Sequence, residues 1–145
     1  MIYKTKNDRE TRQLAKDLAN LVKEKKSRGA RVLALNGDLG SGKTTFTQAL
    51  ARSLGVKEKI KSPTFVLMKA YQAKGLRFFH IDTYRLKDEE DLKVLGFEEI
   101  IENQDNIVVI EWADKVLSAL PFDRIVINFK HISEGEREIE VLGLL

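Results

Sequence analysis

A glycine-rich segment near the start of the chain has the residue types and spacing of a phosphate-binding loop. Residues 37–44 read Gly-Asp-Leu-Gly-Ser-Gly-Lys-Thr and match G-x-x-x-x-G-K-[ST] at every fixed position. Glycines allow the backbone to curl so that successive N–H groups point at phosphate oxygens. Lys43 supplies a cation for the β- and γ-phosphates, and the Thr44 hydroxyl is a ligand for Mg²⁺. The pattern therefore predicts binding of a nucleotide together with magnesium.

The residues on either side of the loop provide the structural context that this motif needs. Residues 31–35 form a short apolar run that predicts a buried strand. From Lys43 to about Leu54 the pattern predicts a helix, which Gly55 ends. A helix that begins in the loop adds the positive end of its dipole to the phosphate site. A glycine-rich surface turn, the alternative interpretation, fits this strand–loop–helix order poorly.

Two acidic residues directly follow apolar segments and could complete a metal site. Asp82 follows residues 76–81, and Glu111 follows residues 107–110. Because ligands gather at the carboxyl ends of strands in open α/β sheets, both acids could face the loop. For each acid the alternative is a surface ion pair or a helix cap, and we favour the metal site. Which acid would hold the metal and which would orient water stays open.

Three further residues each have a chemical and a purely structural interpretation. Thr64, in Ser62-Pro63-Thr64, could sense the γ-phosphate or Mg²⁺ as switch segments do, or Pro63 could simply begin a strand. Arg85 is expected at the surface. Trp112, the single tryptophan, is expected in the core, with adenine stacking or a partner contact as alternatives.

Composition excludes several classes of function. The chain has 145 residues and no cysteine, which removes disulfides, thiolate metal sites and thiol catalysis. Its 25 Lys and Arg against 22 Asp and Glu give a net charge of only +3. The basic clusters at 23–31 and 57–61 are interpreted as solvated helix ends in preference to an RNA-contacting patch. Without a signal peptide or a long apolar run, we expect a cytoplasmic protein with no membrane contact.

The remaining pattern predicts one mixed α/β domain over residues 1–145. An amphipathic helix is expected from Asn7, with Asn7 and Glu10 resembling a capping box. Turns at 73–75 and at Glu134-Gly135 predict two antiparallel hairpins. The expected helices are 7–26, 87–101 in pieces interrupted at Gly96, and 114–120; the expected further strands are 64–70, 76–81, 106–110, 124–129 and 137–142.

The order of the motifs resembles the TsaE family, also called YjeE. The loop alone occurs in many unrelated proteins, whereas the ordered set of motifs is specific. The markers are the loop at 37–45, Ser62-Pro63-Thr64-Phe65, Tyr71, His80-Ile81-Asp82-Thr83-Tyr84-Arg85, Leu95-Gly96-Phe97 and Ile110-Glu111-Trp112. The resemblance runs from Glu10 to Trp112, and the rest of the chain matches only in outline.

The resemblance implies a fold and a biological role. The implied fold is a P-loop NTPase-like three-layer α/β/α sandwich whose mixed sheet has a parallel core and antiparallel hairpins. The implied role is that of a weak bacterial ATPase in tRNA threonylcarbamoyladenosine synthesis. Such a protein would bind ATP and Mg²⁺ and associate with the TsaB–TsaD heterodimer, which its ATP turnover would reset between rounds. It would reach tRNA only indirectly, through that complex.

The resemblance also implies a role for each site residue. Asp82 would be the Walker-B-like acid for hydrolysis, with Lys43 and the switch residue Thr64 as further catalytic groups. Magnesium would be held by Thr44, Glu111 and Asp82. For Trp112 the resemblance implies a position in the site or at an interface instead of in the core. The nucleotide would contact Asp38, Leu39, Gly40, Ser41, Gly42, Lys43, Thr44, Thr45 and Trp112.

Two other functions are compatible with a phosphate-binding loop. A small-molecule kinase usually needs several lid arginines to clamp phosphates, but between Asp82 and Trp112 only Arg85 is present, beside four acids at 88–91. A nucleotide-gated interaction module, in which hydrolysis is incidental, is harder to exclude. It predicts that replacing Asp82 leaves function intact.

Overall fold

The computed structural model describes residues 1–38, 40–61 and 67–144. Within these residues the chain forms one seven-stranded sheet in the order β1-β7-β6-β2-β5-β4-β3. In chain order the elements are β1 (Ile2–Thr5), α1 (Asp8–Glu24), β2 (Arg31–Asn36), α2 (Lys43–Ser53), β3 (Met68–Ala73), β4 (Leu76–Asp82), α3 (Glu89–Val94), α4 (Phe97–Glu102), β5 (Asn106–Glu111), the 3₁₀ helix η1 (Ala113–Ala119), β6 (Ile125–Ser133) and β7 (Glu136–Leu142).

The middle of the sheet is parallel and its edges are antiparallel. β2 pairs in parallel with β5 on one side and β6 on the other, and β4 continues the parallel set beside β5. The hairpins β3–β4 and β6–β7 are antiparallel, as the turn residues predicted. β2 therefore lies at the centre, so the loop that follows it emerges between the ends of its two neighbours.

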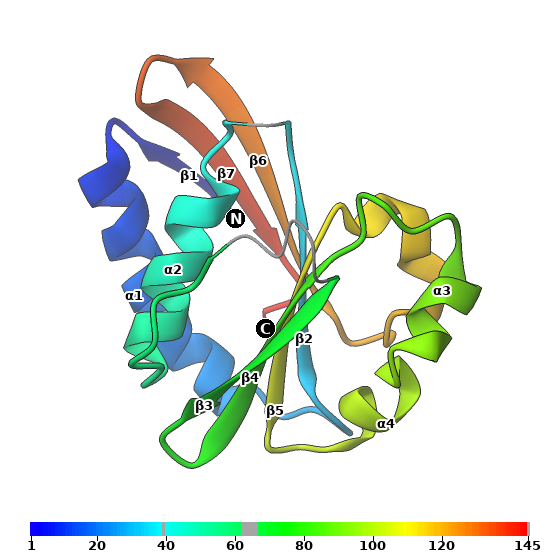
Figure 1. The fold of residues 1–145 in the computed structure, drawn as a ribbon. Coiled ribbons are helices and arrows are strands. Elements are labelled where there is room, and N and C mark those ends of the chain that lie inside the picture. The colour runs from blue at the N-terminus through cyan, green and yellow to red at the C-terminus, as the bar shows by residue number, and fades with distance from the viewer. Residues whose placement is uncertain (39, 62–66, 145) are drawn as a thin grey trace.

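Helices cover both faces of the sheet and make three layers (Figure 1). α1 and α2 pack on one face, while α3, α4 and η1 pack on the other. Residues along β2 alternate between the two cores: Leu33 and Leu35 join the first, Val32 and Ala34 the second. This double burial explains why β2 is a continuous apolar run. The predicted three-layer sandwich is confirmed.

The first helix follows its sequence signals closely. α1 begins after Asn7, whose side chain accepts a hydrogen bond of 2.9 Å from the N–H of Glu10. The Glu10 carboxylate accepts from the backbone N–H of Lys6, at 2.9 Å, so the reciprocal half of the capping box is shifted by one residue. No helix in the described part of the chain is long and apolar enough to cross a membrane.

Three elements differ from the sequence-based expectations. β1 was not expected, because a strand of four residues of mixed polarity carries little periodic signal. It is an edge strand that pairs with β7. β3 runs to Ala73, beyond the expected end at 70, and residues 64–66 of the expected strand lie outside the described residues. The expected helix at 114–120 is a 3₁₀ helix with a kink at Val116, where φ is −130°.

Candidate functional site

The loop between β2 and α2 needs glycine at two positions for steric reasons. Gly37 has φ of 150° and Gly42 has φ of 102°, a backbone region that other residues rarely adopt. A Cβ atom at Gly37 would lie 2.8 Å from the carbonyl oxygen of Phe129, and one at Gly42 would lie 2.5 Å from Nε of Arg137. The loop therefore lies closely against Phe129 of β6 at Gly37 and against Arg137 of β7 at Gly42.

Lys43 begins α2 and lies buried under an aromatic ring. Only 5% of the residue is exposed. Its ammonium donates a hydrogen bond to the Gly37 carbonyl and lies 4.0 Å from the centroid of the Trp112 ring. Thr44 is exposed and Thr45 half-buried, so their hydroxyls are accessible beside the ammonium. The loop thus carries one cation and two hydroxyls at the start of a helix.

Strand pairing brings the two predicted carboxylates to the same place. Asp82 ends β4 and Glu111 ends β5, and the two residues are direct partners in the parallel register. Both face a hollow of about 200 Å³, which we call the loop hollow. Its lining is Gly40, Gly42, Lys43, Thr44, Thr45, Asp82, Glu111, Trp112 and Arg137. Eight of the residues proposed from sequence therefore converge here.

Other residues proposed from sequence lie elsewhere or are not described. Leu39 and Thr64 fall outside the described residues. Ser41 is buried in the loop, and its N–H donates to the Asp38 carbonyl at 3.1 Å. Asp38 is exposed and lines a neighbouring hollow with Asn36 and Gly37. The nucleotide contacts expected of Asp38 and Ser41 are thus not on the lining of the loop hollow.

The charges around Lys43 are mainly negative. Burial lowers the pKa of Lys43 below its ordinary value of 10.5, while the carboxylates of Glu111, Asp82, Asp38 and Asp114 act in the opposite direction. Four acids act on Lys43, and the other cation of the lining, Arg137, is already paired with Asp8, so negative charge is in local excess. Such a site favours a further cation.

The donor set of the hollow fits magnesium bound together with phosphate. The Thr44 hydroxyl and the carboxylates of Glu111 and Asp82 are hard oxygen ligands. Among the described residues, no group of three or more His, Asp or Glu side chains could hold a metal by itself. Mg²⁺ usually takes one or two carboxylates and completes its shell with substrate phosphates and water. The residues present therefore fit that ion.

The two carboxylates have different surroundings. Asp82 is half-buried, and its Oδ1 accepts a hydrogen bond of 2.9 Å from the N–H of Tyr84. Glu111 is 5% exposed, and its Oε2 lies 2.5 Å from Nε2 of the buried His80. Asp82 thus also stabilises the turn after β4. Arg85 is exposed, as expected.

Trp112 has an unusual backbone and lies at the rim of the hollow. Its φ of 62° is the only positive value found for a non-glycine residue among those described. The buried Thr83 hydroxyl donates to the carbonyl oxygens of Glu111 and Trp112, at 2.8 and 2.6 Å, and fixes this turn. The indole also packs against Tyr84, with ring centroids 5.3 Å apart. The core position expected from residue type alone is wrong, because the indole is half-buried beside Lys43.

Sequence reasoning missed Arg137, which lies far downstream on β7. Its side chain is 11% exposed and packs on Gly42. Its Nη1 lies 2.7 Å from an Asp8 carboxylate oxygen and 3.1 Å from the Thr11 hydroxyl. Its buried Nε has no hydrogen-bond partner among the described residues. No local motif marks this arginine, because only the β7–β6 pairing brings it to the loop.

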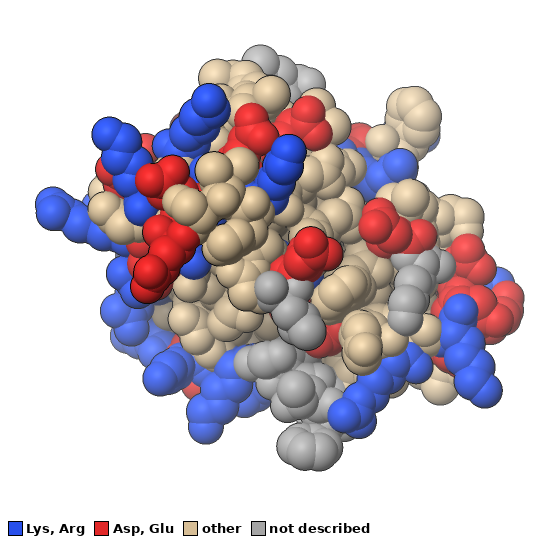
Figure 2. Space-filling model, turned by 90° about the horizontal axis from the view of Figure 1, so that it is seen from above, with Lys and Arg blue, Asp and Glu red and all other residues tan. Residues whose placement is uncertain are grey.

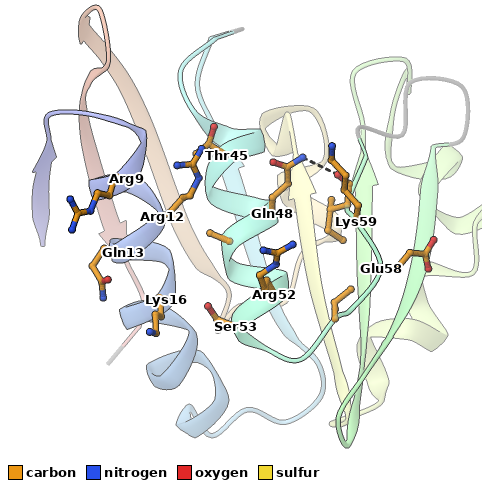
Figure 3. A pocket seen from close by; sticks show the side chains of 13 residues that line it. Arg9, Arg12, Gln13, Lys16, Thr45, Gln48, Arg52, Ser53, Glu58 and Lys59 are labelled. Carbon is orange, nitrogen blue, oxygen red and sulfur yellow. Dashed lines mark hydrogen bonds between the residues drawn. The ribbon is translucent and has the colours of Figure 1, made fainter.

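A larger hollow lies between α1 and the segment that follows α2 (Figure 3). This α1–α2 groove has a volume of about 580 Å³, and Thr45 of α2 is the described residue that lines both the groove and the loop hollow. Its basic side chains are Arg9, Arg12, Lys16, Arg52 and Lys59. Figure 2 shows many Lys and Arg side chains gathered on the left of the molecule, the side on which α1 and α2 lie in Figure 1. Among the described residues that line the groove, Glu58 is the single acid, so the groove differs from the loop hollow with its two carboxylates.

The fold and the hollow together define a class of protein. A P-loop NTPase-like α/β domain has a central parallel strand, a glycine-rich loop, a helix that begins with Lys and Thr, and acids on the neighbouring strands. The structure contains all of these parts. The assignment rests on both the sheet order and the side chains that meet at the loop.

Comparisons with known proteins agree with this class and identify the family. The family described as "Threonylcarbamoyl adenosine biosynthesis protein TsaE" matches residues 5–139. A Bacillus subtilis tRNA threonylcarbamoyladenosine biosynthesis protein TsaE is 39% identical over 94% of this chain and 82% of the relative, and a Haemophilus influenzae TsaE is 35% identical over 90% and 82%. A crystal structure of Bacillus subtilis YdiB matches with a TM-score of 0.73 at 34% identity, covering 96% of this chain and 82% of that one. The chain belongs to the TsaE family.

Proposed function

We propose that the chain binds Mg–ATP in the loop hollow and hydrolyses it weakly, in support of tRNA N6-threonylcarbamoyladenosine formation. The observation that carries this proposal is the meeting of Lys43, Asp82 and Glu111 in one hollow at the start of α2. The names of the relatives, which are tRNA threonylcarbamoyladenosine biosynthesis proteins, support the pathway.

Each residue of the hollow has a distinct task in this proposal. Backbone N–H groups of the loop and the ammonium of Lys43 bind the phosphates. To reach them, the ammonium exchanges its hydrogen bond with the Gly37 carbonyl for one with phosphate oxygen. Thr44 and Glu111 hold Mg²⁺, which when bound neutralises charge on the phosphates.

Asp82 lies where it can orient the attacking water. Its Oδ1 is engaged by the N–H of Tyr84, which leaves Oδ2 to accept a hydrogen bond from water or from a metal-bound water. Arg137 adds a second cation beside Gly42, close to where the loop would surround phosphate. Thr64 keeps its proposed switch role, although it lies outside the described residues.

The partner of the proposed cycle is the TsaB–TsaD heterodimer. ATP turnover on this chain would permit repeated rounds of transfer by that complex, and tRNA would be met only within it. The reaction belongs to the cytoplasm, where tRNA is modified.

Phosphate release from ATP, with Mg²⁺, tests the proposal. The chain would be assayed alone, with TsaB–TsaD from the same source, and as the Asp82→Ala variant. We expect slow release alone, strong stimulation by TsaB–TsaD, and loss of both for the variant while ATP still binds. Normal hydrolysis by Asp82→Ala would reject the catalytic role. Absent stimulation with intact ATP binding would instead favour a nucleotide-gated module with another partner.

A further inference from the structure

A buried histidine contacts the carboxylate of Glu111 from the neighbouring strand. His80 on β4 and Glu111 on β5 are 1% and 7% exposed in their side chains, and Nε2 lies 2.5 Å from Oε2. His80 stands in β4 two residues before Asp82 and points to the same face of that strand. Neither the loop motif nor the proposed chemistry gives this residue a task.

The contacts of the two imidazole nitrogens of His80 indicate which nitrogen carries the proton. Nδ1 of His80 is buried and has no hydrogen-bond partner among the described residues. A buried N–H without an acceptor is costly, so a proton on Nδ1 is disfavoured. These contacts favour the tautomer with the proton on Nε2, from which Nε2 donates to Oε2 of Glu111.

We propose that His80 is a positioning residue that fixes the Glu111 carboxylate for Mg²⁺; this rests on the proposed function. By engaging Oε2, the imidazole leaves Oε1 for the metal and prevents rotation of the carboxylate. Groups behind the ligands of a metal typically change its affinity 10- to 100-fold. The other acid, Asp82, is half-buried, and among the described residues its hydrogen-bond donor is the backbone N–H of Tyr84. The structure thus makes Glu111 the rigid acid of the pair.

Three variants of His80 keep, displace or remove the hydrogen-bond donor to Glu111. In His80→Gln the side-chain amide nitrogen is the same number of bonds from Cα as Nε2, so a donor to Glu111 is kept. In His80→Asn the amide nitrogen corresponds to Nδ1, so the donor is displaced. His80→Leu removes it. The readout is Mn²⁺ affinity, measured by electron paramagnetic resonance on the nucleotide-loaded chain, beside nucleotide affinity in EDTA by calorimetry.

We expect Mn²⁺ binding about 10- to 100-fold weaker for His80→Leu and His80→Asn, with His80→Gln within about threefold of the native chain. Nucleotide affinity in EDTA should be unchanged in all three. Equal Mn²⁺ affinity in His80→Gln and His80→Asn would overturn the proposal. The comparison of these two variants tests the positioning role even if His80→Leu fails to fold. If the native chain bound no nucleotide in EDTA, the proposed function itself would be rejected. The EDTA titration therefore distinguishes failure of the proposed function from failure of the positioning role.

A metal-free measurement tests the same hydrogen bond. Long-range ¹H–¹⁵N spectra of the native chain report which imidazole nitrogen of His80 is protonated. We expect protonated Nε2 and bare Nδ1, and loss of the slowly exchanging Nε2 proton signal in Glu111→Ala. The opposite tautomer would overturn the positioning role, whatever the affinity for metal.

Discussion

The loop hollow and the α1–α2 groove both contain Lys and Arg side chains, yet they differ in what surrounds these cations. In the groove, five Lys and Arg side chains have no ion-pair partner among the described residues, and the nearby Glu58 is paired with Lys69 at 3.0 Å. In the smaller loop hollow, Lys43 is buried among four carboxylates, and Arg137 is paired with Asp8. Positive charge is therefore more plentiful in the groove and more constrained in the hollow.

Size and positive charge therefore do not locate the candidate site. A groove of exposed, solvated cations attracts any anion weakly, since side-chain entropy and screening oppose each contact. The loop hollow presents constrained cations beside carboxylates, the arrangement expected of a specific site for phosphate and metal. Matched substitutions in the two regions test this distinction.

The largest effect is expected for Lys43→Ala, with Lys16→Ala in the groove as its matched control. Loss of Lys43 should weaken ATP binding by about 100-fold or more, because it removes a buried ammonium close to phosphate, and the other cation of the hollow, Arg137, is already paired with Asp8. Lys16→Ala should change the affinity by less than about twofold. Isothermal titration calorimetry measures both, and equal losses would contradict the distinction between the two regions. Unchanged thermal unfolding would show that Lys43→Ala still folds.

Asp82→Asn should separate binding from hydrolysis. The amide keeps an oxygen for the N–H of Tyr84 but cannot accept a proton, so kcat should fall about 100-fold or more with little change in ATP affinity. Steady-state phosphate release and calorimetry together give the two numbers. A fall in affinity without a fall in kcat would assign Asp82 to metal binding alone.

Arg137→Gln should weaken nucleotide binding by about tenfold, because it removes a charged donor beside Gly42. Asp8→Asn is the matched control: it removes the ion pair with Arg137 but leaves the guanidinium in the hollow. If the arginine acts only by tying β7 to α1, both variants should lose equal thermal stability and equal affinity. A loss of affinity confined to Arg137→Gln indicates a role toward the nucleotide.

A smaller effect is expected from pH. Because burial lowers the pKa of Lys43 below 10.5, the ammonium of the free chain loses its proton earlier than an exposed lysine would. Phosphate favours the charged form, so ADP binding should take up protons and weaken as alkaline pH rises through that lowered pKa. Metal-free calorimetry in buffers of different ionisation enthalpy measures the uptake. Lys43→Arg keeps its charge throughout and should flatten the profile.

Local patterns predicted the centre of the molecule well. β2 is marked by a continuous apolar run and α2 by a helical pattern that begins in the glycine-rich loop. The parallel pairing of β4 with β5 places Asp82 and Glu111 together at the ends of these strands. Nothing local indicates β1, whose existence depends on pairing with β7 at the far end of the chain.

The missed contacts have the same cause as the missed strand. Arg137 reaches the loop only after β7 joins the sheet, and no spacing rule links it to Gly42. His80 belongs to a recognised motif, but its task depends on a side-chain contact across two strands. The tautomer proposed for His80 rests on its buried Nδ1, which has no hydrogen-bond partner among the described residues, and no sequence pattern encodes this.

The contact between Lys43 and the single tryptophan has a spectroscopic consequence. A cation 4.0 Å from the indole centroid perturbs the electronic states of that ring. Any ligand that draws the ammonium toward phosphate alters this perturbation, so the emission of Trp112 should change in intensity and wavelength when the loop is filled. With no other tryptophan in the chain, the signal has one source, and the protein carries an intrinsic optical reporter of its own phosphate loop.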